Sequence, residues 1–547
     1  MQPPFQPIAE QQRALDLFLQ GGNLRIDAYA GAGKTATLRL LANSTQKKGL
    51  YLAFNRSIAL EAQQTFPPHI ACVTSHSIAF RGVRRTFKYP ENKLTGSLTL
   101  NSLLEAFRLP ESITFRAGFA LPRQSYAAAL LEGTRAFLRS SDQEPSLSHI
   151  PRYGMLEFIP EDKFLDFAQQ AVGHVQAIWS NMCAREGVLP LGHDGYLKLW
   201  ALSKPVATAD YIMVDEAQDL NPVLLGVLRS VACPLVYVGD PFQQIYDWRG
   251  AINAMNQVKV DHRVLLSQSF RFGPALAQAA TEVIRRIGAT EPVRGNVSLT
   301  SHLARVRPDA ILSRSNAGVI THVLRSLKRN ERCYVLGGTK TLELLLDDVR
   351  RIKAGKPAIT QELLGFSSWK DVLVQSTRPE GADLRQLVGL VREFGEARIQ
   401  AALSRCETEE RMAQVVCSTA HRAKGREWDH VLLDEDFDTA IARSLKPEQS
   451  REKRTSGSDY EAEMRLLYVA LTRARIAVEL PPAILARLRL KLTTEKVLGK
   501  VAAPAAIPDE EPPLSPDHEV IPAAVSPYHS PQKNEPPEMA AIRRFFS

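Results

Sequence analysis

The stretch Ala28-Tyr29-Ala30-Gly31-Ala32-Gly33-Lys34-Thr35 decides the fold, because it lies between an apolar run that begins at Leu24 and a segment rich in helix-forming residues. A strand, a turn of small residues and a helix in this order are typical of a phosphate-binding loop. The small residues let the backbone close around phosphate oxygens, and the N–H groups at the start of the helix point at them. We therefore expect an α/β fold with a nucleoside triphosphate site. Lys34 would contact the β- and γ-phosphates, and Thr35 would bind magnesium.

A second motif supports the phosphate site. The loop itself departs from the usual pattern, since Ala28 stands where the first glycine is common, and a chance glycine turn before a helix would look similar. However, the apolar run at 211–214 ends in Asp215 and Glu216. Asp215 can bind magnesium and Glu216 can accept a proton from the attacking water, so the two motifs together predict hydrolysis of ATP with Mg²⁺. A solvated turn or a helix cap is the alternative for the acidic pair.

The composition excludes several classes of protein. At 547 residues the chain is longer than one usual domain, and 44% hydrophobic residues suffice for several cores. No apolar run approaches the ~18 residues that span a bilayer, and the first residues lack the basic and apolar parts of a signal peptide. We therefore expect a cytoplasmic or nucleoid-associated protein that is not secreted and binds no membrane. The six cysteines are scattered without a Cys-x-x-Cys pair, which indicates free thiols rather than a zinc or iron–sulfur site.

The charge of the chain favours a polyanionic partner. The net charge is +9, although residues 503–547 alone hold seven acidic and three basic side chains. The rest of the chain is therefore more basic than the total indicates. A basic body suits nucleic acid, although many basic proteins never bind it.

The spacing of the motifs predicts two α/β domains, each with a helical insertion. The interval between Lys34 and Asp215 is longer than a compact phosphate-loop domain needs, and helix-forming stretches at 125–139 and 161–185 fill it. Further strands are expected at 235–238, 263–266, 310–312, 332–336, 414–417 and 430–433. The expected parts are a first domain at 1–83 and 202–262 with its insertion at 84–201, a second domain at 263–341 and 411–502 with its insertion at 342–410, and a disordered Pro-rich tail at 503–547.

Four further stretches occur in the order of the motifs of one helicase family, namely Gly239–Ala251, Leu266–Arg271, Thr419–Trp428 and Glu463–Ala474. Together with Gln11, they make the chain resemble the UvrD/Rep/PcrA helicases of superfamily 1 over residues 11–474. Stretches at 51–59, 193–200 and 427–429 are similar to the F-box DNA helicase branch of that family. The resemblance implies that the two α/β domains are RecA-like motor domains. Because Gln11 already matches the first of them, we expect no F-box ahead of it and no ubiquitin-ligase role.

The resemblance also implies a role for each residue of the ATP site. Arg271 and Arg473 match two arginine fingers of the second domain, whose charge stabilises the transferred phosphoryl group. Gln243 matches the sensor that links the γ-phosphate to DNA. The implied catalytic residues are Lys34, Glu216, Gln243, Arg271 and Arg473. The implied nucleotide contacts are Gln11 at the adenine, Ala28, Tyr29, Ala30, Gly31, Ala32, Gly33, Lys34 and Thr35 in the loop, Phe270 at the base and Glu427 at the ribose, with Thr35 and Asp215 on the metal.

The base site departs from the family at two positions. Ala36 stands where an arginine often follows the loop, and Phe270 stands where a tyrosine often precedes the arginine finger. One face of the base would therefore be less covered. This predicts looser discrimination among nucleotides.

Aromatic and polar residues near the motor loops are candidates for contact with a single DNA strand. Stacking on an aromatic ring is worth ~1–3 kcal/mol per base and is largely independent of base sequence. Tyr246 and Trp248 are the stacking candidates, because they follow Gln243 closely. The alternatives are a core position for Trp248 and a structural hydrogen bond for His76. The further candidates, which the resemblance implies because they match DNA positions of the family, are Phe54, Asn55, Thr74, His76, Arg249 and His421.

These features predict an ATP-dependent DNA helicase or translocase of DNA repair, recombination or replication. Movement 3′→5′ on single-stranded DNA and at junctions with duplex is implied by the resemblance alone. The alternative is a nucleic-acid-stimulated ATPase subunit of a defence or anti-recombination assembly without unwinding of its own, because the second insertion is short. A fused nuclease is not supported, since no cluster of acids or cysteines follows the last motif.

The end of the chain predicts a protein partner. In Met539–Ser547, Ile542 stands three residues before Phe545 and Phe546, which resembles the peptide that docks on sliding clamps. On one helical turn these three side chains would project together as an apolar plug. The alternative is a terminus that folds back onto the surface of the protein itself.

Overall fold

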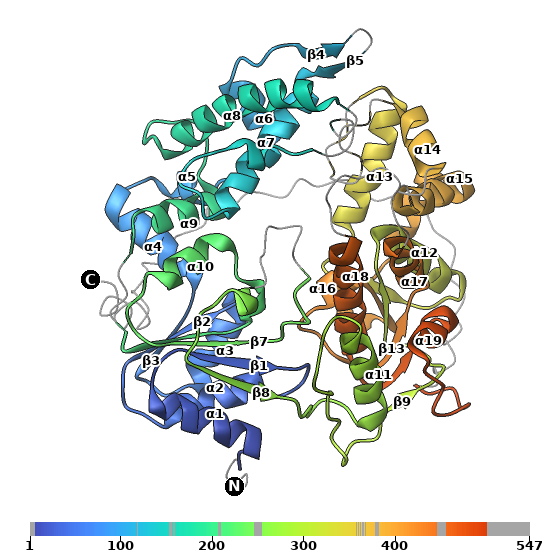
Figure 1. The fold of residues 1–547 in the computed structure, drawn as a ribbon. Coiled ribbons are helices and arrows are strands. Elements are labelled where there is room, and N and C mark those ends of the chain that lie inside the picture. Colours follow the sequence, from blue (N-terminus) through green and yellow to red (C-terminus); the bar gives the residue numbers. More distant parts are fainter. Residues whose placement is uncertain are drawn as a thin grey trace, which may run out of the picture.

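The computed structural model shows two lobes side by side, each with a parallel sheet below and a group of helices above it in the view of Figure 1. The structure describes residues 6–499, except for 117–118, 153–155, 157–158, 206–208, 246–253, several positions between 357 and 367, 378–381 and 446–455. The predicted tail therefore lies outside the described residues. None of the described helices is both long and apolar enough to cross a membrane.

The first domain is built on a six-stranded parallel sheet in the order β3-β2-β6-β7-β1-β8. Most of its strands are nearly continuous apolar runs, because helices cover both faces of a parallel sheet. The strands are β1 (Leu24–Ala28), β2 (Gly49–Ala53), β3 (Ile70–Thr74), β6 (Tyr211–Val214), β7 (Leu235–Gly239) and β8 (His262–Leu266). The helices are α1 (Ala9–Gln20), α2 (Lys34–Asn43), α3 (Arg56–Thr65), α4 (Ser75–Phe87) and α10 (Pro222–Arg229).

The domain boundary that we expected at residue 263 falls inside the edge strand β8 of the first sheet. We expected the strand at 263–266 to begin the second domain, but β8 pairs with β1 from Leu24–His262 to Ala28–Leu266. The residues of a single apolar strand do not reveal which sheet it joins. The chain crosses to the second domain only after Leu266, before α11 (Pro274–Arg285).

The first insertion packs on the first domain through a shared core. Leu52 and Val73 of the sheet belong to the same buried cluster as Tyr126 and Phe137 of the insertion. Its helices are α5 (Glu91–Thr95), α6 (Leu100–Ala106), α7 (Arg123–Arg139), α8 (Glu161–Cys183) and α9 (Gly192–Leu202). It also contains an antiparallel hairpin that we did not predict, formed by β4 (Ser112–Arg116) and β5 (Phe119–Pro122).

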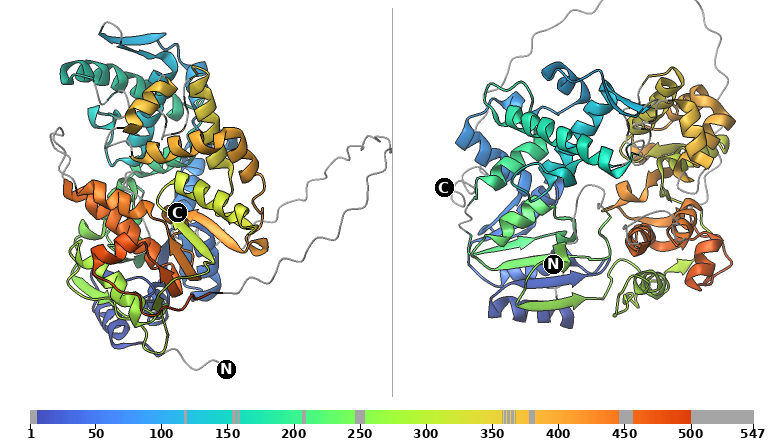
Figure 2. Two further views of the ribbon diagram at one scale, coloured as in Figure 1. Left: turned by 90° about the vertical axis from the view of Figure 1, so that its right-hand side faces the viewer. Right: turned by 45° about the horizontal axis from the view of Figure 1, so that its top comes forward.

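The second domain has its own six-stranded parallel sheet, in the order β11-β12-β10-β13-β14-β9. Its strands are β9 (His302–Leu303), β10 (Ala310–Ser313), β11 (Cys333–Val335), β12 (Val415–Thr419), β13 (Trp428–Leu433) and β14 (Ala474–Glu479). Besides α11, its helices are α12 (Asn316–Lys328), α16 (Ala420–Ala423), α17 (Asp436–Ser444), α18 (Ser456–Leu471) and α19 (Pro482–Leu488). The second insertion contains α13 (Lys340–Lys353), α14 (Trp369–Thr377) and α15 (Ala382–Leu403), and Figure 2 shows these helices grouped above the second sheet.

The predicted α/β class with two parallel sheets is confirmed. The strands expected at 235–238, 310–312, 332–336, 414–417 and 430–433 correspond to β7, β10, β11, β12 and β13. The helical stretches expected at 125–139 and 161–185 correspond to α7 and α8.

Candidate active site

The carboxyl ends of three neighbouring strands meet at the boundary between the two domains. Strands β6, β7 and β1 are adjacent in the first sheet and lead into Asp215, Asp240 and the phosphate loop. In open parallel sheets, ligands bind outside this edge. A cavity of about 510 Å³ lies here, and both domains line it. The lining residues include Gly31, Ala32, Gly33, Lys34, Thr35, Asp215, Glu216, Asp219 and Gln243 of the first domain, Phe270 and Arg271 of the connecting segment, and Lys424, Glu427 and Arg473 of the second domain.

Two glycines give the phosphate loop a shape that other residues would strain. Gly31 has φ 74° and Gly33 has φ 75°, both in the left-handed region. A Cβ at Gly31 would lie 2.5 Å from Ser269 Oγ and 2.7 Å from Arg271 Cβ. The N–H of Phe270 donates to the carbonyl of Gly31 at 2.8 Å. The loop is therefore packed directly against the segment that crosses to the second domain.

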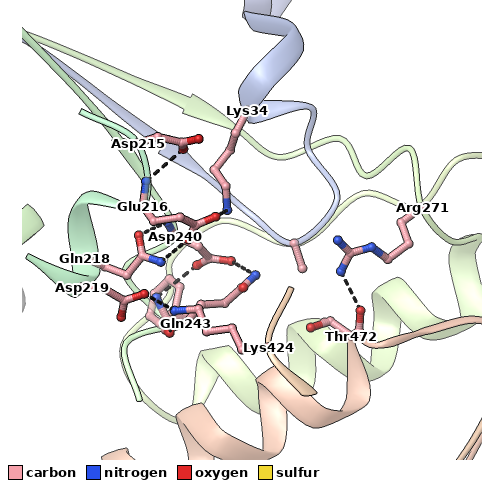
Figure 3. A network of polar contacts seen from close by, with 12 residues as sticks. Lys34, Asp215, Glu216, Gln218, Asp219, Asp240, Gln243, Arg271, Lys424 and Thr472 are labelled. Atoms are coloured by element: carbon pink, nitrogen blue, oxygen red, sulfur yellow. Dashed lines mark hydrogen bonds and ion pairs between the residues drawn. The ribbon is translucent and has the colours of Figure 1, made fainter. Parts of the chain in front are cut away.

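Lys34 and Glu216 form an ion pair in the cavity, with Nζ 3.0 Å from Oε1 (Figure 3). Burial acts to raise the pKa of Glu216, but the charges of Lys34 and Lys424 outweigh it and hold this pKa at about 2. Glu216 is therefore ionised at neutral pH, as a proton acceptor must be. Burial raises the pKa of Asp215 to about 6, and the charge of Glu216 adds to the shift. Asp215 accepts a hydrogen bond from the hydroxyl of Tyr51 at 2.7 Å.

Asp219 and Asp240 add two buried carboxylates that we did not single out from the sequence. Burial raises the pKa of each to about 6. Asp219 Oδ1 is buried, and none of the described residues forms a hydrogen bond with it. Four acids around Lys34 form a site in which a cation would relieve the repulsion between carboxylates.

These four acids suit a magnesium ion that is also bound by the phosphate oxygens of a nucleotide. Among the residues that the structure describes, no group of three or more His, Cys, Asp or Glu side chains could hold a metal by itself. Magnesium usually takes one or two carboxylates and completes its shell with phosphate and water. Asp215 and the exposed hydroxyl-bearing Thr35 both line the cavity and could supply such a partial set.

Two arginines reach the cavity from the side of the second domain. Arg271 Nη2 lies 2.6 Å from Glu427 Oε1, and Arg271 Nη1 donates to the carbonyl of Thr472 at 2.7 Å. Arg473 is 2% exposed and donates from Nε to the carbonyl of Val469 at 2.8 Å. Burial lowers the pKa of Arg473 to about 9, and the charge of Arg271 adds to the shift. Arg271 and Arg473 repel each other, so a bound polyanion beside the phosphate loop would stabilise both charges.

Direct contacts join the two domains at this site. Lys424 forms an ion pair with Asp219 and donates to the carbonyl of Gln243 at 2.8 Å. Figure 3 shows Lys424 directed from the second domain toward the carboxylates of the first. The hydroxyl of Tyr468 accepts from the N–H of Ala30 and donates to Asp240 Oδ2, both at 3.1 Å. We did not predict Lys424 or Tyr468, although both lie within stretches that resemble helicase motifs.

Several predicted nucleotide contacts lie behind the loop rather than on the cavity wall. The Gln11 side chain is buried, donating to Thr37 Oγ1 at 3.1 Å and accepting from the N–H of Ile8 at 3.2 Å. Ala28 ends β1, and Tyr29 donates its hydroxyl to the carbonyl of Glu291 at 3.1 Å. Ala30 is 1% exposed. An adenine contact from Gln11 would require it to exchange these partners.

Two of the DNA candidates line the cavity. Phe54 is 47% exposed and lines the cavity with Asn55, which caps α3 by accepting from the N–H of Ile58. Thr74 caps α4 by accepting from the N–H of Ser77 at 3.1 Å. His76 has a lowered pKa because of burial. Its ring lies 6.1 Å from those of His193 and Tyr196 in the first insertion. His421 lies in α16, and Tyr246, Trp248 and Arg249 are outside the described residues.

Comparison with known proteins identifies the class. The model of the UvrD/REP helicase N-terminal domain matches residues 162–263, and the model of the UvrD-like helicase C-terminal domain matches residues 374–479. The chain therefore contains two domains that match UvrD-like helicase models, as its motifs predicted.

The similarity extends beyond these two domains to one branch of the family. F-box DNA helicase 1 of Gallus gallus is 33% identical over 507 residues, covering 85% of this chain and 48% of the relative. F-box DNA helicase protein 1 of Schizosaccharomyces pombe is 28% identical over 509 residues, covering 85% of this chain and 56% of the relative. The ATP-dependent DNA helicase PcrA of Staphylococcus aureus is 30% identical over 133 residues, 23% of this chain and 18% of the relative. The resemblance to the F-box DNA helicase branch is confirmed, and the chain spans about half the length of these F-box relatives.

Proposed function

We propose that this protein is an ATP-dependent DNA helicase or translocase that moves 3′→5′ on single-stranded DNA. The observation that carries the proposal is the composite cavity, in which Lys34 and Glu216 of one domain face Lys424 and Arg473 of the other. Such a site is complete only when both domains are in contact. Binding and hydrolysis of a nucleotide would therefore be coupled to closure and opening of the two domains.

The proposed chemistry assigns a task to each group in the first domain. Lys34 leaves its ion pair with Glu216 and binds the β- and γ-phosphates of ATP, while Thr35 and Asp215 hold Mg²⁺. The metal ion would supply positive charge to the phosphate oxygens. Glu216, released from Lys34, accepts the proton of the attacking water. Gln243 contacts the γ-phosphate from the loop after β7.

The proposed role of the second domain is to supply charge to the transition state. Arg473 and Arg271 stabilise the transferred phosphoryl group, an effect that can be worth ~10³–10⁵ in rate for an arginine supplied across a cleft. Glu427 holds Arg271 until nucleotide binds and then contacts the ribose. Phe270, 43% exposed beside the loop, covers one face of the base.

The proposed DNA contacts come from both domains. Tyr246 and Trp248 would stack on bases, and they follow Gln243 by only a few residues, so the γ-phosphate sensor and the stacking candidates lie in one short stretch of sequence. Phe54, Asn55, Thr74, His76, Arg249 and His421 would hold the strand on the surface of the two domains. The direction of movement rests on the family resemblance.

The test combines ATPase and strand-displacement assays on the full chain. We expect single-stranded DNA to stimulate ATP hydrolysis, and the protein to displace the strand of a duplex with a 3′ tail but not of one with a 5′ tail. Glu216→Gln is the matched inactive control. Stimulated hydrolysis without displacement on either substrate would instead favour an ATPase subunit of a larger assembly. ATP hydrolysis that DNA does not stimulate would reject both the helicase hypothesis and the hypothesis of an ATPase subunit.

A further inference from the structure

A buried tyrosine of the second domain reaches into the active site of the first. Tyr468 lies on α18 and is 0% exposed. Its hydroxyl accepts a hydrogen bond from the N–H of Ala30 in the phosphate loop (3.1 Å) and donates one to Asp240 Oδ2 (3.1 Å). Tyr468 belongs to a buried cluster that also contains Ala30 and Ile245 of the first domain. One hydroxyl therefore joins α18 to two loops of the other domain.

Asp240 organises the loop after β7. Its Oδ1 accepts from the N–H of Phe242 at 3.0 Å, and its Oδ2 accepts from Nε2 of Gln243 at 2.8 Å. Gln243 is the proposed γ-phosphate sensor, so Asp240 fixes the direction of that side chain. Tyr468 donates to the same oxygen that holds Gln243.

Asp240 is also connected to the proposed proton acceptor. Its backbone N–H donates to Oε1 of Gln218 at 3.1 Å, and Nε2 of Gln218 donates to Oε2 of Glu216 at 2.5 Å. The contact between Gln218 and β7 is tight, because a Cβ at Gly239 would lie 2.2 Å from Gln218 Oε1. A shift of Asp240 would therefore be transmitted to Glu216.

The energetics favour a positional role for the Tyr468 hydroxyl over simple filling of the core. A buried carboxylate that loses a hydrogen-bond donor incurs a desolvation cost, and hydrogen bonds to charged groups are stronger than those between neutral groups. The donor is available only while α18 of the second domain rests on the first domain. In this arrangement Tyr468 supplies the acceptor of the Ala30 amide and adds a donor to the two that Asp240 receives from its own loop.

We propose that Tyr468 is a positioning residue. Its hydroxyl bonds to Asp240 only when the two domains are in contact, and through Asp240 it aligns Gln243 and Glu216. This deepens the proposed function, on which it rests. The ring of Tyr468 fills the interface, and its hydroxyl aligns the sensor and the proton acceptor when the second domain is seated. The alternative is a tyrosine that matters only for packing.

The first test needs neither nucleotide nor DNA. Tyr468→Phe keeps the ring and removes the acceptor of the Ala30 amide. We expect hydrogen exchange of that amide to become about 3- to 10-fold faster, which corresponds to loss of one neutral hydrogen bond. Tyr460→Phe, on the same helix, is the matched control and should exchange like the wild type. Unchanged exchange in Tyr468→Phe would overturn the proposal.

The second test separates alignment from packing by steady-state kinetics. Tyr468→Phe should lower kcat of the DNA-stimulated ATPase about 10- to 100-fold while the KM for ATP changes less than about threefold, because alignment of reacting groups acts on the transition state. The melting temperature should stay near that of the wild type. Unchanged kcat, or a loss explained by unfolding, would overturn the proposal. Absence of DNA-stimulated ATPase in the wild type would instead reject the proposed function, and the exchange test would still decide whether the hydrogen bond forms.

A double-mutant cycle with Asp240→Asn identifies the route. If Tyr468 acts through Asp240, the two substitutions together should cost little more in kcat than the larger single effect. Additive losses would show that Tyr468 acts elsewhere and would overturn the route.

Discussion

Lys424 of the second domain forms an ion pair with Asp219 of the first, and the two side chains are only 9% and 1% exposed. The Lys424 ammonium also donates to the carbonyl of Gln243 at 2.8 Å. Because Glu216 lies between these groups and the phosphate loop, one lysine both joins the domains and lowers the pKa of the proposed proton acceptor. Breaking a buried pair on one side leaves an uncompensated charge, which costs more than loss of a surface pair.

The first prediction is that Lys424→Met destabilises the protein in a pH-dependent way. Burial already raises the pKa of Asp219 to about 6, with Lys424 opposing the shift. Without Lys424 this pKa rises further, so below about pH 6 Asp219 takes up a proton and the penalty disappears, whereas above that pH the buried charge remains. We expect the melting temperature to fall by several degrees at pH 8 and by little at pH 5.5.

The control for this experiment is Lys353→Met, which removes a partly exposed ion pair with Glu396 in the second insertion. It should change the melting temperature by less than ~2 °C, because partly exposed pairs contribute ~0–1 kcal/mol. An equal drop for Lys424→Met at both pH values would show that packing of the lysine stem, rather than its charge, holds the domains together.

The second prediction concerns the chemical step. Glu216→Gln keeps the shape and the hydrogen bond from Gln218 but removes the proton acceptor, so ATP and DNA should still bind while turnover falls about 10²–10⁴-fold. Lys34→Ala should lose nucleotide affinity as well, because it removes the charge at the phosphates. Near-normal turnover of Glu216→Gln would reject this residue as the base. Nucleotide binding by fluorescence and turnover by phosphate release measure the two effects separately.

Sequence alone predicted the parts of the site that local patterns encode. The turn at Gly31 and Gly33 and the acids after 211–214 depend on neighbours in the chain, so strand, loop and helix signals were sufficient. Asp240 could have been found by the same reasoning, since it directly follows the predicted strand at 235–238. The alternating residues Ser112–Arg116 before Gly118 were likewise a hairpin signal that we did not use.

Other features depend on pairs that are distant in the sequence. Tyr468 lies in a mostly apolar helical run, and its contact with Asp240 spans 228 positions, so no local pattern indicates it. The same holds for β8, whose pairing with β1 places it in the first sheet. Gln11 matched the family motif, but only the structure shows that its amide is already occupied by Thr37 and Ile8.

The third prediction concerns coupling to DNA. If Trp248 stacks on a base, Trp248→Ala should lose most strand displacement while keeping much of the ATPase activity. Stacking contributes ~1–3 kcal/mol to binding of the DNA strand, whereas the Trp248 side chain would not contact the phosphates of ATP. Trp248→Phe keeps an aromatic face and should retain an intermediate displacement rate. Equal losses of ATPase and displacement in both variants would favour a core position for this tryptophan. Parallel ATPase and displacement assays make the comparison.

The last prediction concerns the tail. Ile542, Phe545 and Phe546 would form an apolar plug at the end of a Pro-rich tether, which places a docked partner within reach while leaving the two domains free to move. Deletion of residues 539–547 should therefore leave ATPase and strand displacement intact and abolish binding to a purified sliding clamp, measured by surface plasmon resonance. Replacement of Arg543 and Arg544 by alanine is the matched control, because these side chains would face away from the groove, and it should weaken binding far less than the deletion. A deletion that instead lowers the melting temperature or the ATPase of the isolated protein would show that the segment folds back onto the protein, and the docking hypothesis would be wrong.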